Sequence, residues 1–220
     1  ILGEEIVDNF PVLNHDAFDD GNLVNVGNTE NGIPIQLNKT WVESDVKITV
    51  GFVEPHFFAG FSGGPKMISP GLAGFSTIMA LHDFQMIADK NSRWGITVGN
   101  PIHDSIRDIA SKIPATFSID VTLNKNNEIT CCYAGNLFKV HNAAMDVVKR
   151  ISMKPVKKPF DIVVTTNSGY PLDLNMYQAI KGISAAYQIV KKGGTIICAA
   201  ECSDGIPEHG EYKNILSSAS

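Results

Sequence analysis

Glycine and proline interrupt the stretch from Gly60 to Gly71, which contains four glycines, two prolines and one lysine. Proline lacks the backbone donor that helices and central strands use, and glycine weakens both, so this stretch cannot form one continuous helix or strand. An apolar run at 45–50 indicates a strand upstream, and a helical pattern follows at 74–88. The chain therefore passes from a strand through an irregular loop into a helix, where α/β proteins often place binding sites.

The first 150 residues mix strand patterns with helical ones. Short apolar runs flank a turn at Asn31–Gly32, and a period-2 run followed by an Asn-rich turn predicts a later hairpin. This portion is therefore predicted to be of the α+β type with a mixed sheet. The predicted helices lie at 101–112 and 137–150, and the predicted strands at 23–26, 33–37, 117–123 and 128–133.

A linker and a βαβ unit are predicted after this portion. Residues 152–159 contain two prolines and three lysines without periodicity, which is typical of a linker. Apolar runs at 161–165 and 195–200 flank a helical pattern at 174–191 that ends near Gly193, so two parallel strands joined by a helix are expected. We predict an α/β fold class in which the α+β portion precedes the start of a doubly wound parallel domain. The predicted boundaries are 1–153, a linker at 154–159, and 160–220.

Composition excludes several classes of protein. The net charge is −5, with 18 basic and 23 acidic residues, which disfavours a nucleic-acid surface. No stretch approaches the roughly 20 apolar residues of a membrane span, so no membrane partner and a cytoplasmic location are expected. The four cysteines lack zinc-finger spacing, and the adjacent Cys131 and Cys132 are interpreted as buried reduced thiols rather than a metal site.

Five residues around the glycine-rich loop could carry chemistry. His56 follows a predicted strand and can exchange a proton near neutral pH. Gly63 and Gly64 would let backbone N–H groups approach an anion, and Lys66 adds a donor or a nucleophile, although the spacing is not that of a Walker A motif. His82 falls among apolar residues of the predicted helix. From spacing alone, a structural turn with core histidines explains these residues about as well as a site does.

Two segments resemble the nickel-pincer-nucleotide lactate racemase family. They occur in the family's order, about 110 residues apart. The resemblance implies that residues 1–153 are the C-terminal part of an N-terminal cofactor-binding domain and that 160–220 begin a C-terminal domain. The matching residues are Pro55, His56, Gly60, Ser62, Gly63, Gly64, Lys66, Pro70, Gly71 and His82 in the first segment, and 165–182 in the second.

The resemblance also assigns roles to individual residues. Lys66 would be the covalent anchor of a nickel-pincer nucleotide beside Gly63 and Gly64, and His82 would be the protein ligand of Ni(II), a metal that imidazole suits. His56 would be one of two catalytic bases. Gln178 and Lys181, three residues apart on a predicted helix, would line the substrate pocket.

The implied reaction is racemisation or epimerisation of a lactate-like 2-hydroxy acid by reversible hydride transfer to the bound cofactor. Its partners would be that small-molecule substrate and the proteins that make and insert the cofactor, without which Lys66 is expected to be bare. Two other hypotheses for the function of these residues stay open. One is a Schiff-base lysine for pyridoxal phosphate, and the other is a non-catalytic small-molecule or anion-binding domain.

The remaining histidines match no family motif. His15 lacks the surroundings of a catalytic base, and His103 and His141, the latter on a helix face interpreted as polar, have no partner by spacing. His209 is interpreted as a surface residue.

The 220-residue chain alone is expected to be inactive. The resemblance places the family's second catalytic histidine and a substrate-binding arginine in sequence N-terminal to Ile1. We predict that this chain with cofactor loaded does not racemise any 2-hydroxy acid. The test is chiral chromatography of single enantiomers incubated with the loaded chain, and measurable turnover would contradict the prediction.

Overall fold

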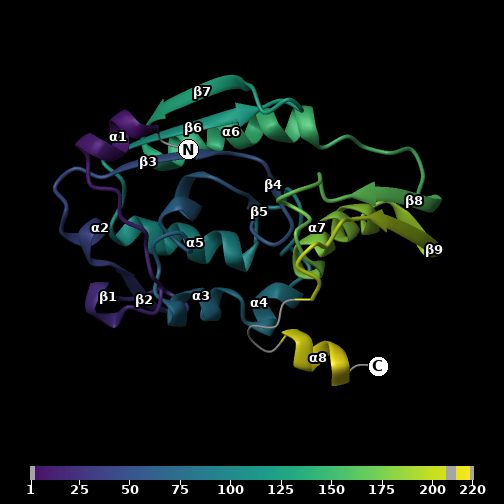
Figure 1. Ribbon diagram of the computed structural model, residues 1–220, viewed down its shortest axis with the longest axis horizontal. Helices are drawn as coiled ribbons and strands as arrows, with labels where there is room; N and C mark the ends of the chain where they lie inside the picture. The colour runs from purple at the N-terminus through teal and green to yellow at the C-terminus, as the bar shows by residue number, and fades with distance from the viewer. Residues whose placement is uncertain (1–2, 207–211, 219–220) are drawn as a thin grey trace. The chain divides into compact units, whose positions relative to one another are not determined.

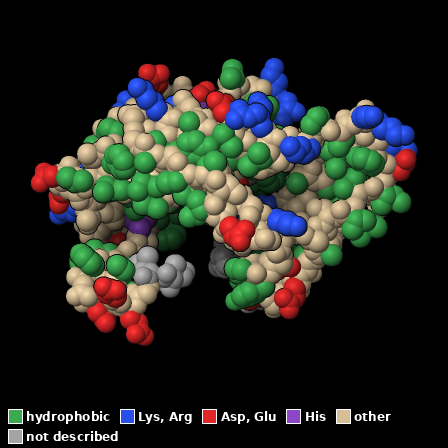
Figure 2. All heavy atoms as spheres, turned by 90° about the horizontal axis from the view of Figure 1, so that it is seen from above, with side chains coloured by type: hydrophobic (Ala, Val, Ile, Leu, Met, Phe, Trp, Pro, Cys, Tyr) green, Lys and Arg blue, Asp and Glu red, His purple; other side chains and the backbone are tan. Residues whose placement is uncertain are grey.

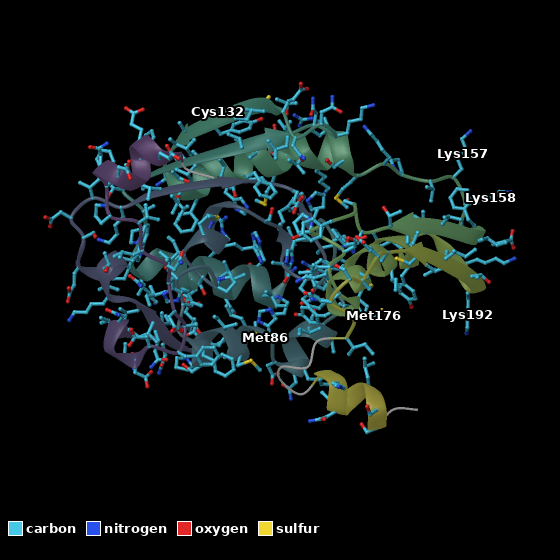
Figure 3. All side chains as sticks on the ribbon, viewed as in Figure 1. Met86, Cys132, Lys157, Lys158, Met176 and Lys192 are labelled. Atoms are coloured by element: carbon cyan, nitrogen blue, oxygen red, sulfur yellow. The ribbon has the colours of Figure 1, made fainter. Side chains whose placement is uncertain are left out.

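The computed structural model describes residues 3–206 and 212–218, so His209 lies outside the described residues. The chain forms two compact units, Ile1–Met153 and Lys154–Ser220, and each is described by itself (Figure 1). The residues 154–159, predicted as a linker, stand at the start of the second unit, and Lys157 and Lys158 lie on the segment between α6 and β8 (Figure 3). The assignment of cofactor-binding and C-terminal domains to these ranges stays a prediction.

The first unit combines a mixed sheet with helices. Its helices are α1 (Glu4–Asn9), α2 (Lys39–Glu43), α3 (Phe75–Leu81), α4 (Phe84–Ala88), α5 (Pro101–Lys112) and α6 (Leu137–Ser152), with 3-10 turns η1 (Asp20–Asn22) and η2 (Gly64–Met67). Its strands are β1 (Leu23–Asn28), β2 (Pro34–Asn38), β3 (Ile48–Phe52), β4 (Pro55–His56), β5 (Gly60–Phe61), β6 (Phe117–Leu123) and β7 (Ile129–Gly135).

Three strands form the main sheet of this unit, in the order β3-β6-β7. The central strand β6 pairs in parallel with β3, so that Gly51 lies opposite Asp120, and antiparallel with β7. The predicted mixed sheet and the predicted hairpin are therefore confirmed. Helix α6 runs along this sheet (Figure 1).

The sheet buries its polar face. In β6 the side chains of Ser118, Asp120 and Thr122 are each 0% exposed, while the alternate residue Phe117 is 41% exposed. Strand β3 follows the same rule and exposes Ile48, Val50 and Phe52. Figure 2 shows hydrophobic side chains gathered over part of the surface that it draws. An alternating strand does not by itself say which face is covered, and here the covered face is the polar one.

Helices α5 and α6 contribute many of the core residues. The side chain of Asn100 caps α5 by accepting hydrogen bonds from the N–H groups of Ile102 and His103. The side chain of Asn136 caps α6 by accepting a hydrogen bond from the Lys139 N–H. Helical spacing places apolar residues of each helix on one buried side. The main core cluster includes Ile35, Leu37, Ile68, Leu81, Ile102, Ile106, Ile109 and Leu137, and a second cluster holds Val53, Phe61, Ala144, Met145 and Val148.

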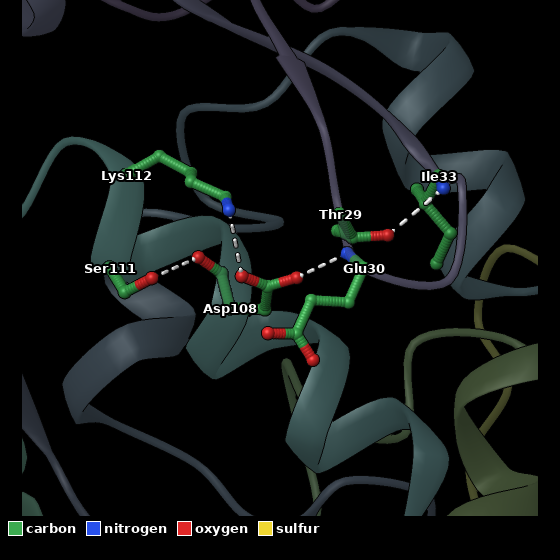
Figure 4. A network of polar contacts seen from close by, with 6 residues as sticks. All are labelled: Thr29, Glu30, Ile33, Asp108, Ser111 and Lys112. Atoms are coloured by element: carbon green, nitrogen blue, oxygen red, sulfur yellow. Dashed lines mark hydrogen bonds and ion pairs between the residues drawn. The ribbon is translucent and has the colours of Figure 1, made fainter.

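A polar network joins the predicted Asn31–Gly32 turn to α5 (Figure 4). The N–H of Gly32 donates to the Thr29 carbonyl at 2.9 Å, which closes the turn between β1 and β2. The Asp108 carboxylate of α5 accepts the Glu30 N–H at 2.7 Å and pairs with Lys112 at 3.3 Å. The hairpin is thereby held against a helix almost eighty residues away in sequence.

The second unit contains β8 (Phe160–Thr166), α7 (Met176–Tyr187), β9 (Val190–Ala199) and α8 (Tyr212–Ser218). Strands β8 and β9 are parallel with α7 between them, so the predicted βαβ unit and the overall α/β fold class are confirmed. The predicted end of the helix was wrong. The backbone around Gly193 belongs to β9 rather than to a helix cap, because its flanking residues pair with β8.

Two other local predictions are corrected. The helix predicted at 74–88 breaks at His82, since the Asp83 side chain caps a new helix by accepting the Gln85 N–H. Cys131 and Cys132 are exposed rather than buried, because β7 is the outer strand of its sheet, as the labelled Cys132 shows in Figure 3. None of the helices within 3–206 and 212–218 is long and apolar enough to cross a bilayer.

Core packing around α5 leads to a stability prediction. Ile109 is 0% exposed, and replacing it with alanine leaves a cavity, so Ile109→Ala should lower the free energy of unfolding by about 3 kcal/mol. Ile129→Ala, at a side chain that is 65% exposed, should cost less than about 1 kcal/mol. Urea unfolding of both variants makes the comparison, and equal losses would contradict the assigned core.

Candidate active site

His56 lies in a two-strand turn in which β4 pairs with β5. Its Nδ1 accepts the backbone N–H groups of Phe58 and Ala59 at 3.2 and 3.1 Å. A neutral imidazole has one donor and one acceptor nitrogen, so this geometry places the proton of neutral His56 on Nε2. The side chain is half-buried. The turn therefore selects the tautomer of the ring.

Lys66 lies in η2, and its Nζ is 3.3 Å from the Nε2 of His56. The structure thus brings together two of the residues predicted from the sequence. The two nitrogens are therefore within hydrogen-bonding distance of each other. Lysine acts as a nucleophile through its amine nitrogen, so a lysine at this place suits a covalent anchor.

Gly63 and Gly64 have positive φ angles of 73° and 50°. A Cβ on Gly63 would lie 2.7 Å from the Phe52 carbonyl oxygen, and one on Gly64 would lie 2.4 Å from the ring of His141. Both positions therefore demand glycine for conformation and for space. The N–H of Gly64 is already taken, since it donates to Asp120 Oδ1 at 3.2 Å. This leaves the loop with one fewer donor for an anion than the sequence suggested.

Two buried histidines lie beneath the loop. His103 and His141, which have no partner by sequence spacing, stack in the structure with ring centroids 6.2 Å apart. His141 is 2% exposed and donates from Nε2 to the Ser62 carbonyl at 2.9 Å. The interpretation of its helix face as polar was also wrong, because helical spacing puts it between Leu137 and Met145 on the buried side of α6.

Burial changes the protonation of these groups. Desolvation, with smaller effects of His103, Arg107 and Lys66, lowers the pKa of His141 to about 4. Desolvation also lowers the pKa of His103, aided by the nearby Arg107. Burial raises the pKa of Asp120, against the opposing hydrogen bond from Gly64. Both histidines are therefore neutral at physiological pH and serve as hydrogen-bonding and packing groups.

His82 stands at the exposed end of α3, where it is the residue after the last helical turn. Its Nδ1 lies 2.8 Å from the Ile78 carbonyl oxygen and donates to it, which leaves the lone pair of Nε2 directed away from the backbone. Metal-binding histidines commonly have this second hydrogen bond. Among the described residues, no group of three or more His, Cys, Asp or Glu side chains could hold a metal. A metal at His82 would therefore need most of its donors from a bound molecule.

Gln178 and Lys181 lie on α7 in the second unit, and both are half-buried. The Asn175 side chain caps this helix by accepting the Gln178 N–H at 3.1 Å. Gly182 lets α7 approach β8 closely, since a Cβ there would lie 2.4 Å from the Thr166 carbonyl oxygen. The two predicted pocket residues thus share one helix, and their side chains lie one turn apart.

His15 lies apart from these residues of the first unit, beside a cavity of about 320 Å³ that Asp16, Asp19 and Trp41 also line. Its Nε2 contacts the Ala73 carbonyl oxygen at 2.9 Å, and its Nδ1 lies 3.2 Å from the Asn38 amide nitrogen. Both ring nitrogens are therefore used in holding the N-terminal segment.

Asp120 was not among the residues predicted from the sequence. Only its place on an alternating strand was visible in the sequence, and that pattern favoured burial of the opposite, apolar face. The missed burial of His141 did have a signal, namely its spacing of four from Leu137 and from Met145.

The chain is similar to known proteins. The chain matches the family description "Lactate racemase N-terminal domain" over residues 1–95 and "Lactate racemase C-terminal domain" over residues 156–220. It is 40% identical over 212 residues to a lactate racemase of Thermoanaerobacterium thermosaccharolyticum and 40% identical over 213 residues to one of Lactiplantibacillus plantarum. These alignments cover 96% and 97% of the chain but 50% of each relative. The chain therefore spans about half the length of the curated relatives it matches.

A solved structure is also similar. The lactate racemase apoprotein from Thermoanaerobacterium thermosaccharolyticum superposes with a TM-score of 0.92 and 40% sequence identity, covering 96% of this chain and 50% of that one.

The buried histidines lead to a pH prediction. Because the pKa of His141 is lower in the folded state than the ordinary value of 6.5, protons bind the unfolded state first as pH falls from 6.5 to about 4. Stability present above pH 6.5 should be lost across this window, by about 3 kcal/mol from His141. Urea unfolding from neutral pH to about pH 4 should show a smaller loss in His141→Gln than in the wild type. Identical pH profiles would refute the assignment.

Proposed function

Because the chain belongs to the lactate racemase family, we propose that it forms part of a racemase or epimerase of a 2-hydroxy acid. The observation that carries this proposal is the pairing of His56 and Lys66 at 3.3 Å, on a loop whose two glycines no other residue could replace. A base and an amine nucleophile side by side are what proton transfer and covalent cofactor attachment require. The relatives are named for lactate, which supports a lactate-like 2-hydroxy acid as the substrate class.

The residues of the loop fit a lysine-tethered nickel-pincer nucleotide. Lys66 would carry the covalent bond, Gly63 and Gly64 would hold the chain close to the cofactor, and His82 would ligate Ni(II) through Nε2. The lone pair of that atom is left available by the Nδ1 contact with the Ile78 carbonyl. When bound, this group would accept and return the hydride of the substrate Cα.

His56 would handle the proton of the substrate hydroxyl. In the neutral ring the proton sits on Nε2, facing Lys66, so His56 can donate a hydrogen bond to a substrate oxygen from the start. Accepting the hydroxyl proton at Nε2 requires the Phe58 and Ala59 N–H groups to release Nδ1, since that atom must then carry the ring proton. Proton transfer would thus be coupled to a movement of the turn between β4 and β5.

Gln178 and Lys181 would bind the substrate. A lysine ammonium attracts the carboxylate of a 2-hydroxy acid, and a glutamine amide can donate to a carboxylate or carbonyl oxygen. Their places on one face of α7 would let them contact the same molecule. The other expected partners are the proteins that make and insert the cofactor, and the expected location is the cytoplasm.

The test uses the complete gene product made together with the cofactor-synthesis proteins. Wild-type protein should show a mass adduct on Lys66 and bound nickel, and it should racemise a 2-hydroxy acid. Lys66→Ala should lose all three, because the anchor is gone. His82→Ala should keep the adduct but lose nickel and activity, and His56→Gln should keep both and lose roughly 10²–10⁴-fold in rate.

Lys90→Ala is the matched control, since Lys90 is an exposed lysine of the same unit, and it should keep the adduct, the nickel and the activity. Full activity of both Lys66→Ala and His82→Ala would remove the catalytic proposal and favour a binding domain. An aldimine absorbance without nickel would instead favour a pyridoxal phosphate enzyme.

A further inference from the structure

The carboxyl group of Asp120 is fully buried, and only one of its two oxygens has a hydrogen-bond partner among the described residues. Asp120 is 0% exposed on the central strand β6, and its Oδ2 has no hydrogen-bond partner among the described residues. Its neighbours on the same face are satisfied, because Ser118 accepts a hydrogen bond from Thr49 at 2.8 Å and Thr122 contacts Thr130 at 2.8 Å. A buried carboxyl with one unpaired oxygen destabilises a folded protein. Its presence therefore calls for an explanation, such as a functional role.

Among the described residues, the hydrogen bond that the carboxyl accepts comes from the loop that carries the lysine. Asp120 Oδ1 accepts the N–H of Gly64 at 3.2 Å, two residues before Lys66. Strand β3 leaves room for this contact, since Gly51 lies opposite Asp120 and a Cβ on Gly51 would come within 3.1 Å of Oδ1. A side chain at position 51 would therefore crowd the Asp120 carboxyl.

The same loop is held from its other side by α6. His141 donates from Nε2 to the Ser62 carbonyl, and its ring fills the space where a Cβ of Gly64 would stand. The peptide groups around Gly64 thus have one fixed acceptor and one fixed donor, on two different elements. A turn held at both sides sets where the next residues, Pro65 and Lys66, begin.

We propose that Asp120 is a positioning residue for Lys66, acting through its hydrogen bond to the Gly64 N–H to hold the lysine beside His56. In this role it acts through the loop backbone. Its effect on cofactor attachment rests on the proposed function, whereas its effect on the loop does not. Attachment of a cofactor to an amine depends steeply on placement, because errors of about 1 Å can lower such rates by 10²-fold.

The experiment compares Asp120→Ser, Asp120→Asn and Ser118→Ala in the complete gene product. Serine stays polar, like Ser118 and Thr122, but is too short to reach Gly64. Asparagine keeps an acceptor oxygen at the same position. Ser118→Ala removes a buried polar group from the same strand face without touching the loop, so it reports any general effect of disturbing that face.

Hydrogen–deuterium exchange at the Gly64 amide is the first readout. Exchange should be about tenfold faster or more in Asp120→Ser and within about twofold of wild type in Asp120→Asn and Ser118→Ala. Wild-type exchange in Asp120→Ser, or equally fast exchange in Ser118→Ala, would overturn the proposal. If Asp120→Ser does not fold, Asp120→Asn decides, since tenfold faster exchange in that variant overturns the proposal and wild-type exchange supports it.

The mass adduct on Lys66 is the second readout. Its rate of formation should fall about tenfold or more in Asp120→Ser and recover in Asp120→Asn. Asp120→Ser could show faster exchange at the Gly64 amide and still form the adduct at the wild-type rate. That result would also overturn the positioning role. If wild-type protein forms no adduct at all, the proposed function fails, and the exchange data alone then decide whether Asp120 holds the loop.

Discussion

The close approach of the loop at Gly63 and Gly64 to its neighbours is the constraint on which the site of the first unit depends. A single added carbon at Gly64 would overlap the ring of His141, and one at Gly63 would overlap the backbone of β3. The loop can therefore pass between α6 and the sheet only without side chains. This passage carries the chain from β5 into η2 and brings Lys66 back to within 3.3 Å of His56.

The sheet under this loop is polar where most sheets are apolar. Asp120 lies on its covered face, and the pKa of that carboxyl is raised by burial. A covered sheet face usually carries residues such as valine or isoleucine. In β3 such residues, Ile48 and Val50, lie instead on the exposed face. The polar face instead supplies an acceptor to the loop. Stability is thus reduced beneath the site in return for a defined loop position, a pattern that functional sites often show.

Hydrogen bonds also set the state of each histidine near the loop. Backbone N–H groups fix the Nδ1 lone pair of His56, the Ile78 carbonyl binds Nδ1 of His82, and the Ser62 carbonyl binds Nε2 of His141. Each of these contacts decides which ring nitrogen remains for chemistry. Three histidines are thereby given different properties by their backbone surroundings, and the Nε2 of His56 lies 3.3 Å from the Nζ of Lys66.

The sequence by itself determined the kinds of elements and the order of the motifs. Glycine and proline define the loop, period-2 alternation defines β6, and helical spacing defines α5, because these patterns depend on local backbone geometry. The family resemblance also followed from residues such as Lys66 and His82. Tertiary structure alone decided that the polar face of β6 is covered and that Gly64 donates to Asp120. A local pattern shows that an element has two faces, but which face is buried depends on what distant segments pack against it.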